Sequence, residues 1–366
     1  MKIIHIVKIC CIALFLNAVS AQASPLLSQT TVGETELISQ FHGDPINADL
    51  RLLMAGNQIV VMDLLIKEFQ IQHPYIKKIF YVTLPPGKEL QWILKGGIEL
   101  HGENSFEKNG FMLKVQPDVY SSVSKGHMDK LNAAGIIDEF ITYAHNRLVL
   151  MVKSDDPLAG STLTAQQFYD LMSDPTVTIS EPNILTQGIE RHIWQMYTDT
   201  SKVIYPADTL IQGLNGKMFD PSQLAADPTN SLRRIVYLDK VAAGATDVVP
   251  IHHLTTPENL RLGNTRLGPV WTTEVLYQQN RLGATDISSV EIGDKGADGQ
   301  FLDRREKVNY IATMTKGVMD KKHKLAAILF LTFLQSEAAQ LIMESVGFIP
   351  ATANELATSF KYPHID

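Results

Sequence analysis

The chain contains 366 residues, of which 45% are hydrophobic and 19% are charged, and its formal net charge is −7 at pH 7. Acidic and basic residues are well mixed, and no basic run exceeds Lys321-Lys322-His323-Lys324, so the composition does not support nucleic-acid binding. A chain of this length can form two domains of ordinary size.

The N-terminus has the pattern of a secretory signal peptide. Lys2 and Lys8 precede the apolar run 9–16, and Ala21-Gln22-Ala23 supplies the small-x-small pattern that signal peptidase requires. The apolar run is short for a membrane span and polar residues soon follow it, although an uncleaved anchor is the alternative. We therefore expect cleavage of residues 1–23 and a periplasmic protein.

Both cysteines of the chain, Cys10 and Cys11, lie within this signal segment. The mature protein would therefore contain neither disulfides nor reactive thiols. Residues 24–48, which are rich in Ser, Thr, Gln and Gly, are expected to form a loose N-terminal lead.

Beyond residue 48 the hydrophobic pattern alternates between strands and helices. The first series predicts strands at 52–54, 79–82 and 118–120, helices at 57–72 and 89–94, a turn at 85–87 and a polar surface insertion at 99–109. A short helix carrying Met128 and Leu131 should end at Gly135, and the apolar run 148–152 suits a strand that is buried on both faces. This alternation predicts a parallel sheet with helices on both sides.

A second series follows the same alternation. It predicts helices at 161–172 and 187–197, strands at 177–179, 248–251, 268–271 and 310–314, and a helix opened by 255–257. The apolar run 325–334 is about half the length that a membrane span needs, so we expect a buried core helix. Ser336 and Gly347 are the expected N-cap and C-cap of a final helix over 337–345.

Ligands of open α/β sheets bind where strands end and helices begin, and four such loops carry suitable polar groups. They are Ala55-Gly56-Asn57-Gln58, Ser121-Ser122, Leu185-Thr186-Gln187-Gly188, and the pair formed by 252–257 and 268–274. Each loop also has a plain structural interpretation: Asn57 can be an N-cap, Ser122 part of a serine turn, 187–188 a simple helix start, and Trp271 a wall residue.

The four loops occur in an order that resembles the periplasmic molybdate-binding family, within the type II periplasmic solute-binding proteins. In this resemblance Asn57 stands at the position of the first ligand serine and Ser122 at that of the second. Gln187-Gly188 matches the loop whose backbone N–H faces an oxyanion, and Gly268 to Glu274 matches the strand that carries a ligand tyrosine, with Trp271 at the tyrosine. The C-terminal patterns 310–312, 326–340 and 347–350 are also similar.

The resemblance implies an α/β protein with the two-lobed type II periplasmic binding protein fold. Each lobe would be a mixed, mostly parallel sheet flanked by helices, and two strands would form the hinge. We expect lobe 1 to comprise 49–147 plus 319–357 and lobe 2 to comprise 148–318, with crossings near 146–148 and 314–320. The implied ligand contacts are Asn57, Ser122, Gln187, Gly188, His252, Thr255 and Trp271.

The pair His252-His253 raises the alternative of a metal site. No Cys and no His at helical spacing completes a tetrahedral set, so we expect no metal and treat one histidine as a hydrogen-bond donor to the ligand. G-x-S-x-G, H-E-x-x-H and Walker-lysine motifs are absent from the sequence, so we expect neither an enzyme nor a cofactor.

The expected function is capture of a small, anionic ligand, such as a molybdate-like oxyanion, by neutral donors and helix N-termini. The resemblance implies delivery to a membrane ABC permease, and we expect a monomer that closes on its ligand by hinge motion. The alternatives are a ligand-sensing module for a partner receptor, an organic or metal-chelate ligand, and an enzyme on the same fold.

Overall fold

The computed structural model describes residues 41–100, 111–182, 189–216, 221–249, 255–293, 308–317 and 320–357. Within these ranges the chain forms a seven-stranded sheet, a six-stranded sheet and a small ribbon of β4 (Ile98–Leu100) with β5 (Phe111–Leu113). The expected signal segment, and most of the expected lead and polar insertion, lie outside these ranges.

The seven-stranded sheet has the order β1-β3-β2-β6-β14-β7-β15. Its strands are β1 (Phe41–His42), β2 (Leu50–Ala55), β3 (Ile79–Leu84), β6 (Val119–Ser122), β7 (Ile141–Asn146), β14 (Val308–Met314) and β15 (Ile349–Pro350). Strand β2 pairs in parallel with both β3 and β6, whereas β14 runs antiparallel to β6 and β7. The carboxyl ends of β2, β3, β6 and β7 therefore share one edge.

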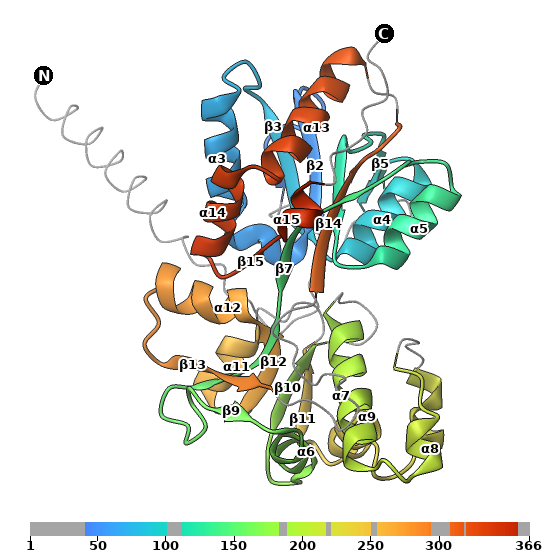
Figure 1. Ribbon diagram of the computed structural model, residues 1–366, viewed down its shortest axis with the longest axis vertical. Helices are drawn as coiled ribbons and strands as arrows, with labels where there is room; N and C mark the ends of the chain where they lie inside the picture. Colours follow the sequence, from blue (N-terminus) through green and yellow to red (C-terminus); the bar gives the residue numbers. More distant parts are fainter. Residues whose placement is uncertain are drawn as a thin grey trace, which may run out of the picture. The chain divides into compact units, whose positions relative to one another are not determined.

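Two groups of helices cover this sheet (Figure 1). On one face lie the 3-10 turn η1 (Gly56–Val60), α3 (Met62–Gln72), α13 (Lys321–Leu334) and α14 (Glu337–Ser345); on the other lie α4 (Pro86–Lys95) and α5 (Lys125–Ala133). The Phe69 ring packs edge-on against Phe330, with 5.2 Å between centroids, and also contacts Phe333 at 5.4 Å. The apolar run of α13 is thus a buried core helix, as its sequence predicted.

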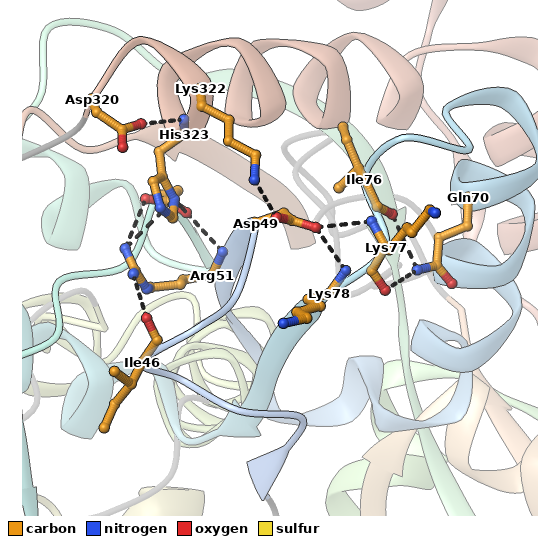
Figure 2. A network of polar contacts seen from close by, with 11 residues as sticks. Ile46, Asp49, Arg51, Gln70, Ile76, Lys77, Lys78, Asp320, Lys322 and His323 are labelled. Carbon is orange, nitrogen blue, oxygen red and sulfur yellow. Dashed lines mark hydrogen bonds and ion pairs between the residues drawn. The ribbon is translucent and has the colours of Figure 1, made fainter.

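Polar contacts fix the amino ends of β2 and β6 to the first turn of α13, as Figure 2 shows. The Asp49 carboxylate accepts hydrogen bonds from the Lys322 ammonium and from backbone N–H groups at the start of β3. Arg51 donates its backbone N–H to Asp118, and the His323 ring lies 2.8 Å from the same carboxylate. This edge is held together by its own side chains, which leaves the opposite, carboxyl edge for a ligand.

The six-stranded sheet has the order β11-β10-β12-β8-β13-β9. Its strands are β8 (Leu148–Lys153), β9 (Thr162–Leu163), β10 (Ile179–Pro182), β11 (Thr246–Val249), β12 (Leu267–Trp271) and β13 (Ile287–Ile292). Strand β10 is parallel to β11 and β12, and β8 is antiparallel to β12 and β13. The carboxyl ends of β10, β11 and β12 again share one edge.

Strand β8 is buried on both faces, which confirms the prediction made from its apolar run. Leu148, Leu150 and Val152 pack with α6 (Ala165–Ser173) and α7 (Glu190–Ile204), while Val149 and Met151 pack with α11 (Thr256–Leu262) and α12 (Thr272–Leu276). The remaining elements are α8 (Thr209–Gln212), η2 (Pro221–Ala226), α9 (Leu232–Arg234), the π-turns η3 (Ile235–Asp239) and η5 (Tyr277–Arg281), α10 (Lys240–Ala242) and α15 (Ala353–Leu356).

Two expected boundaries differ from the structure. Strand β14 was expected in lobe 2, but it pairs with β6 and β7 of the first sheet, so the chain returns to that sheet before Val308 and not at 314–320. Strand β1, which was expected in the loose lead, pairs with β3. Both sheets are mixed, as expected, and antiparallel pairing through β14 and β8 takes a larger share than predicted, because these strands follow the passages between the sheets.

Local details of the helices follow the expected chemistry with one correction. Ser336 caps α14 by accepting from the Ala339 N–H at 3.3 Å, and Gly347 ends it at a φ of 92°. Pro86 does not form a turn but opens α4, where a proline suits the first helical position. Among the described residues no single helix is long and apolar enough to cross a membrane; α13 and α14, bent by 61°, meet that requirement only when taken together.

Candidate functional site

The loops that were expected to bind a ligand emerge from the carboxyl edges of the two sheets. In the first sheet β2 ends at Ala55 and β6 at Ser122, and in the second sheet β12 ends at Trp271. Gln187, Gly188, His252 and His253 lie outside the described residues. Asn57, Ser122 and Trp271 therefore lie at or just after strand ends, where α/β proteins hold ligands.

Asn57 and Trp271 both contact Tyr310. The buried Asn57 amide donates to the Tyr310 hydroxyl, and the Trp271 and Tyr310 rings lie edge to face at a centroid distance of 6.5 Å. Asn57 lies inside η1 and does not cap a helix, contrary to one of our expectations, because Ala55 occupies the cap position. The Trp271 ring, only 2% exposed, also contacts His192 at 5.6 Å and is therefore part of a packed wall.

A hydrogen-bonded junction joins this cluster to the passage between the sheets. The Asn146 amide donates to Thr273 at 3.0 Å and to the Tyr310 hydroxyl at 3.4 Å. Arg147, the only residue between β7 and β8, exchanges backbone and side-chain hydrogen bonds with Thr272. The carboxyl ends of β7 and β12 are thereby tied together.

Ser122 is fully buried and belongs to the last position of β6, not to a helix start. Its Oγ accepts from the Ser124 N–H at 3.1 Å and lies 2.9 Å from His127 Nδ1. The same Nδ1 lies 3.1 Å from the Tyr120 hydroxyl, which donates its own hydrogen to the Pro86 carbonyl at 2.7 Å.

These contacts determine where the protons lie. The Tyr120 hydroxyl donates its hydrogen to the Pro86 carbonyl, so it can only accept a hydrogen bond from His127. We therefore infer that Nδ1 of His127 carries the ring proton. Burial, reinforced by the charges of Arg191 and Lys130, lowers the pKa of His127 to about 4 and keeps the ring neutral. Ser122 then accepts from the Ser124 N–H and shares the single Nδ1 hydrogen with Tyr120, so its own hydrogen can turn either to the neighbouring Tyr120 hydroxyl or to an anion.

The neighbouring Ser121 faces the opposite side of the sheet, since strand residues alternate. Its hydroxyl lies 2.7 Å from that of Tyr143, and the Tyr143 and Tyr310 rings are 6.3 Å apart. Burial raises the pKa of both phenols, so both remain neutral donors and acceptors. Ser121 therefore extends the Asn57 cluster, whereas Ser122 belongs to a second cluster with His127.

Three polar residues of this edge were missed by sequence reasoning. Glu89, in the first turn of α4, is fully buried, and burial raises its pKa well above the usual value despite a hydrogen bond from the Leu84 N–H. Thr83 at the end of β3 is also buried. Arg191 of α7 reaches Ser124 with its guanidinium at 3.3 Å, which brings a positive charge next to His127. A strand end followed by a helix at 83–89 was the available signal, but Pro85-Pro86-Gly87 suggested only a turn.

Thr255 lies at the N-cap of α11 and is half-buried, and Pro257 occupies the first turn as predicted. In the part of the chain that the structure describes, no three His, Cys, Asp or Glu side chains are grouped to hold a metal ion. The candidate site is therefore a set of hydroxyls, amides and one neutral acid at the strand ends, with the Arg191 guanidinium near the Ser122 cluster and that of Arg147 on Thr272.

The model of one protein family matches residues 50–349, which is most of the chain and includes both sheets. This family is described as bacterial extracellular solute-binding protein. The chain belongs to this family. Its members are solute-binding proteins that act outside the cytoplasm, and no curated protein sequence matches the chain significantly.

Solved structures support the same fold. A substrate-binding protein of an ABC transporter from Agrobacterium tumefaciens is 12% identical, covers 87% of this chain and 86% of its own, and has a TM-score of 0.57. The periplasmic molybdate-binding protein of Azotobacter vinelandii is 15% identical over 83% of this chain and 100% of its own, with a TM-score of 0.52. A sulfate-binding protein from Mycobacterium tuberculosis is 11% identical over 84% and 88%, with a TM-score of 0.52.

At these identities the similarity establishes the fold and not the ligand. Two sheets with flanking helices are the architecture of the type II periplasmic solute-binding proteins, so the fold expected from the sequence is confirmed.

Proposed function

We propose that the protein captures a small anionic ligand, such as an oxyanion, at the carboxyl edges of its two sheets and delivers it to a membrane ABC permease. The observation that carries the proposal is the Ser122 cluster, where a buried hydroxyl has a hydrogen that His127 does not accept while the Arg191 guanidinium lies nearby. Neutral donors with one adjacent positive charge favour an anion over a cation.

In this proposal the two sheets belong to two lobes, and Asn57, Ser122, Gln187, Gly188, His252, Thr255 and Trp271 contact the ligand. The Asn146–Thr273 contact lies at one passage between the lobes, and hinge motion there closes the site. The protein is a periplasmic monomer after cleavage of residues 1–23, and it binds its ligand without converting it.

The test is a thermal-shift and calorimetric screen of molybdate, tungstate, sulfate, phosphate and small carboxylates. A ligand that binds only the folded protein stabilises it by RT ln(1 + L/Kd), where L is the free ligand concentration, so one of these anions should give a clear rise in melting temperature that grows with the logarithm of its concentration. The bound anion should be recovered unchanged. If cations or neutral sugars shift the transition and no anion does, the anionic ligand class is wrong.

A serine variant tests the role of the Ser122 cluster. We expect Ser122→Ala to weaken the anion found in the screen at least tenfold, because a hydrogen bond to a charged group is worth about 1.5–3 kcal/mol. The measurement is the Kd from titration calorimetry, compared with Ser345→Ala, which removes a hydroxyl from the exposed end of α14. Equal affinities of the two variants would remove Ser122 from the site.

A further inference from the structure

Two buried side chains at the carboxyl edge of the first sheet have polar atoms without hydrogen-bond partners. They are Oε2 of Glu89 and Oγ1 of Thr83, in residues that are 0% and 1% exposed. Both amide atoms of the buried Gln58 also lack hydrogen bonds of good geometry, although this side chain lies beside the Tyr143 hydroxyl. Because folded proteins satisfy nearly all buried polar groups, these groups need a partner that the described part of the chain does not supply.

The Oε1 of Glu89 accepts the Leu84 N–H at 3.1 Å, and Leu84 directly follows Thr83 on β3. Leu84 packs with α4 and strand residues alternate, so the Thr83 hydroxyl faces the other side of the sheet at the same strand end. A charge on Glu89 would also act on the hydroxyls of both Tyr120 and Tyr143. The carboxyl group is therefore near enough to both hydroxyls for its charge to act on them.

The chemistry of a neutral acid then determines what Glu89 can bind. Full burial strongly favours the protonated form. Since Oε1 already accepts the Leu84 N–H, the proton belongs on Oε2, which becomes an O–H donor. An ionised carboxylate at the same place would accept hydrogen bonds, repel anions and attract cations.

We propose that Glu89 and Thr83, from the two faces of the sheet at the end of β3, donate hydrogen bonds to oxygens of a fully ionised oxyanion and so determine the ligand class of the site. The inference rests on the proposed function and deepens it, because it adds the end of β3 and the first turn of α4 to the binding surface. An uncharged acid donates a hydrogen bond, so it can bind an oxyanion that carries no proton of its own. While it is protonated, the same acid offers a cation no negative charge.

The test uses four variants of the full-length mature protein and calorimetric titration with molybdate, sulfate and phosphate as probes. Glu89→Gln keeps an N–H donor without charge and should retain binding within about threefold, whereas Glu89→Leu removes the donor and should weaken it at least tenfold, as expected for a lost hydrogen bond to a charged group. Thr83→Val should weaken binding by a similar factor while raising the melting temperature of the ligand-free protein, because it removes a buried hydroxyl that lacks a partner.

The matched control is Thr198→Val, in which the same substitution removes a buried hydroxyl that donates to the Trp194 carbonyl at 2.9 Å. It should lower stability and leave the affinity for the probes unchanged. If Glu89→Leu does not fold, the affinities of Thr83→Val and Glu89→Gln for the probes still test the proposal.

The outcomes separate this inference from the proposed function. Binding of a probe by the wild type with unchanged affinity in Thr83→Val and Glu89→Leu would overturn the inference and leave anion capture intact. Loss of binding in Glu89→Gln would show that an ionised carboxylate is needed, which overturns the inference as well. A wild type that binds none of the anions would overturn both.

Discussion

Replacing Asp227 with alanine should destabilise the protein by about 3–5 kcal/mol, because it leaves a buried guanidinium without its counter-ion. Arg233 donates to both carboxylate oxygens of Asp227, one of them at 2.7 Å, and the two side chains are only 4% and 5% exposed. The guanidinium also stacks over the Trp194 ring at 4.6 Å and donates to the Asn215 carbonyl at 3.2 Å. These further contacts do not supply the missing negative charge.

The measurement is equilibrium unfolding in urea, with Asp239→Ala as the matched control. Asp239 pairs with Arg234 at 3.7 Å in the same region, but its side chain is 47% exposed, so its removal should cost at most about 1 kcal/mol. Similar losses in the two variants would mean that the Asp227–Arg233 pair is not desolvated in solution.

A second large effect should appear in the pH dependence of stability. Glu181, at the end of β10, is fully buried, and both the Tyr197 and the Tyr237 hydroxyls donate to its carboxyl group. Burial outweighs these hydrogen bonds and the nearby Lys240 charge, and it raises the pKa of Glu181 from 4.5 to about 8. The folded protein therefore binds the Glu181 proton more tightly than the unfolded chain does.

The sign follows from linkage. Because the folded pKa exceeds the unfolded one, the contribution of Glu181 is fully present below about pH 4.5 and is lost as the pH rises towards 8, at roughly 1.4 kcal/mol per pH unit. Glu181→Gln cannot ionise, so it should resemble the wild type at pH 5 and be more stable by several kcal/mol at pH 8. Urea unfolding of both proteins from pH 5 to pH 8 measures this difference.

The comparison with Glu181→Gln isolates one group from the others that titrate in this range. Burial lowers the pKa of Lys240 to about 8, but Lys240 is present in both proteins and its effect largely cancels in the difference. Unfolding curves whose midpoints stay equally far apart at every pH would contradict the prediction and indicate that the Glu181 carboxyl is solvated.

Much of the architecture could be predicted from local pattern alone. The alternation of apolar strands with amphipathic helices located both sheets, and the all-apolar run 148–152 correctly indicated a strand buried on two faces. The local pattern does not determine to which sheet a strand belongs. The sequence of β14 is compatible with either sheet, because its partners β6 and β7 lie more than 160 residues away and pairing is decided by the whole fold.

The candidate site was predictable to a smaller extent. Ser122, Asn57 and Trp271 lie at or just after the strand ends that the sequence indicated, and their contact with a ligand stays a prediction. Glu89 was missed because a glutamate in the first turn of an amphipathic helix is usually solvated, and only the close approach of α4 to β3 buries it. Arg191 was missed for a related reason, since its neighbour Ser124 is 67 residues away in the chain.

The placement of the three tryptophans gives the protein a built-in optical reporter. Trp92 lies beneath the Lys88 ammonium and Trp194 beneath the Arg233 guanidinium, whereas Trp271 alone contacts Tyr310, the partner of Asn57. Phenylalanine at positions 92 and 194 would leave a single emitter beside the candidate site. Its fluorescence should then follow solute capture in real time, without any attached dye.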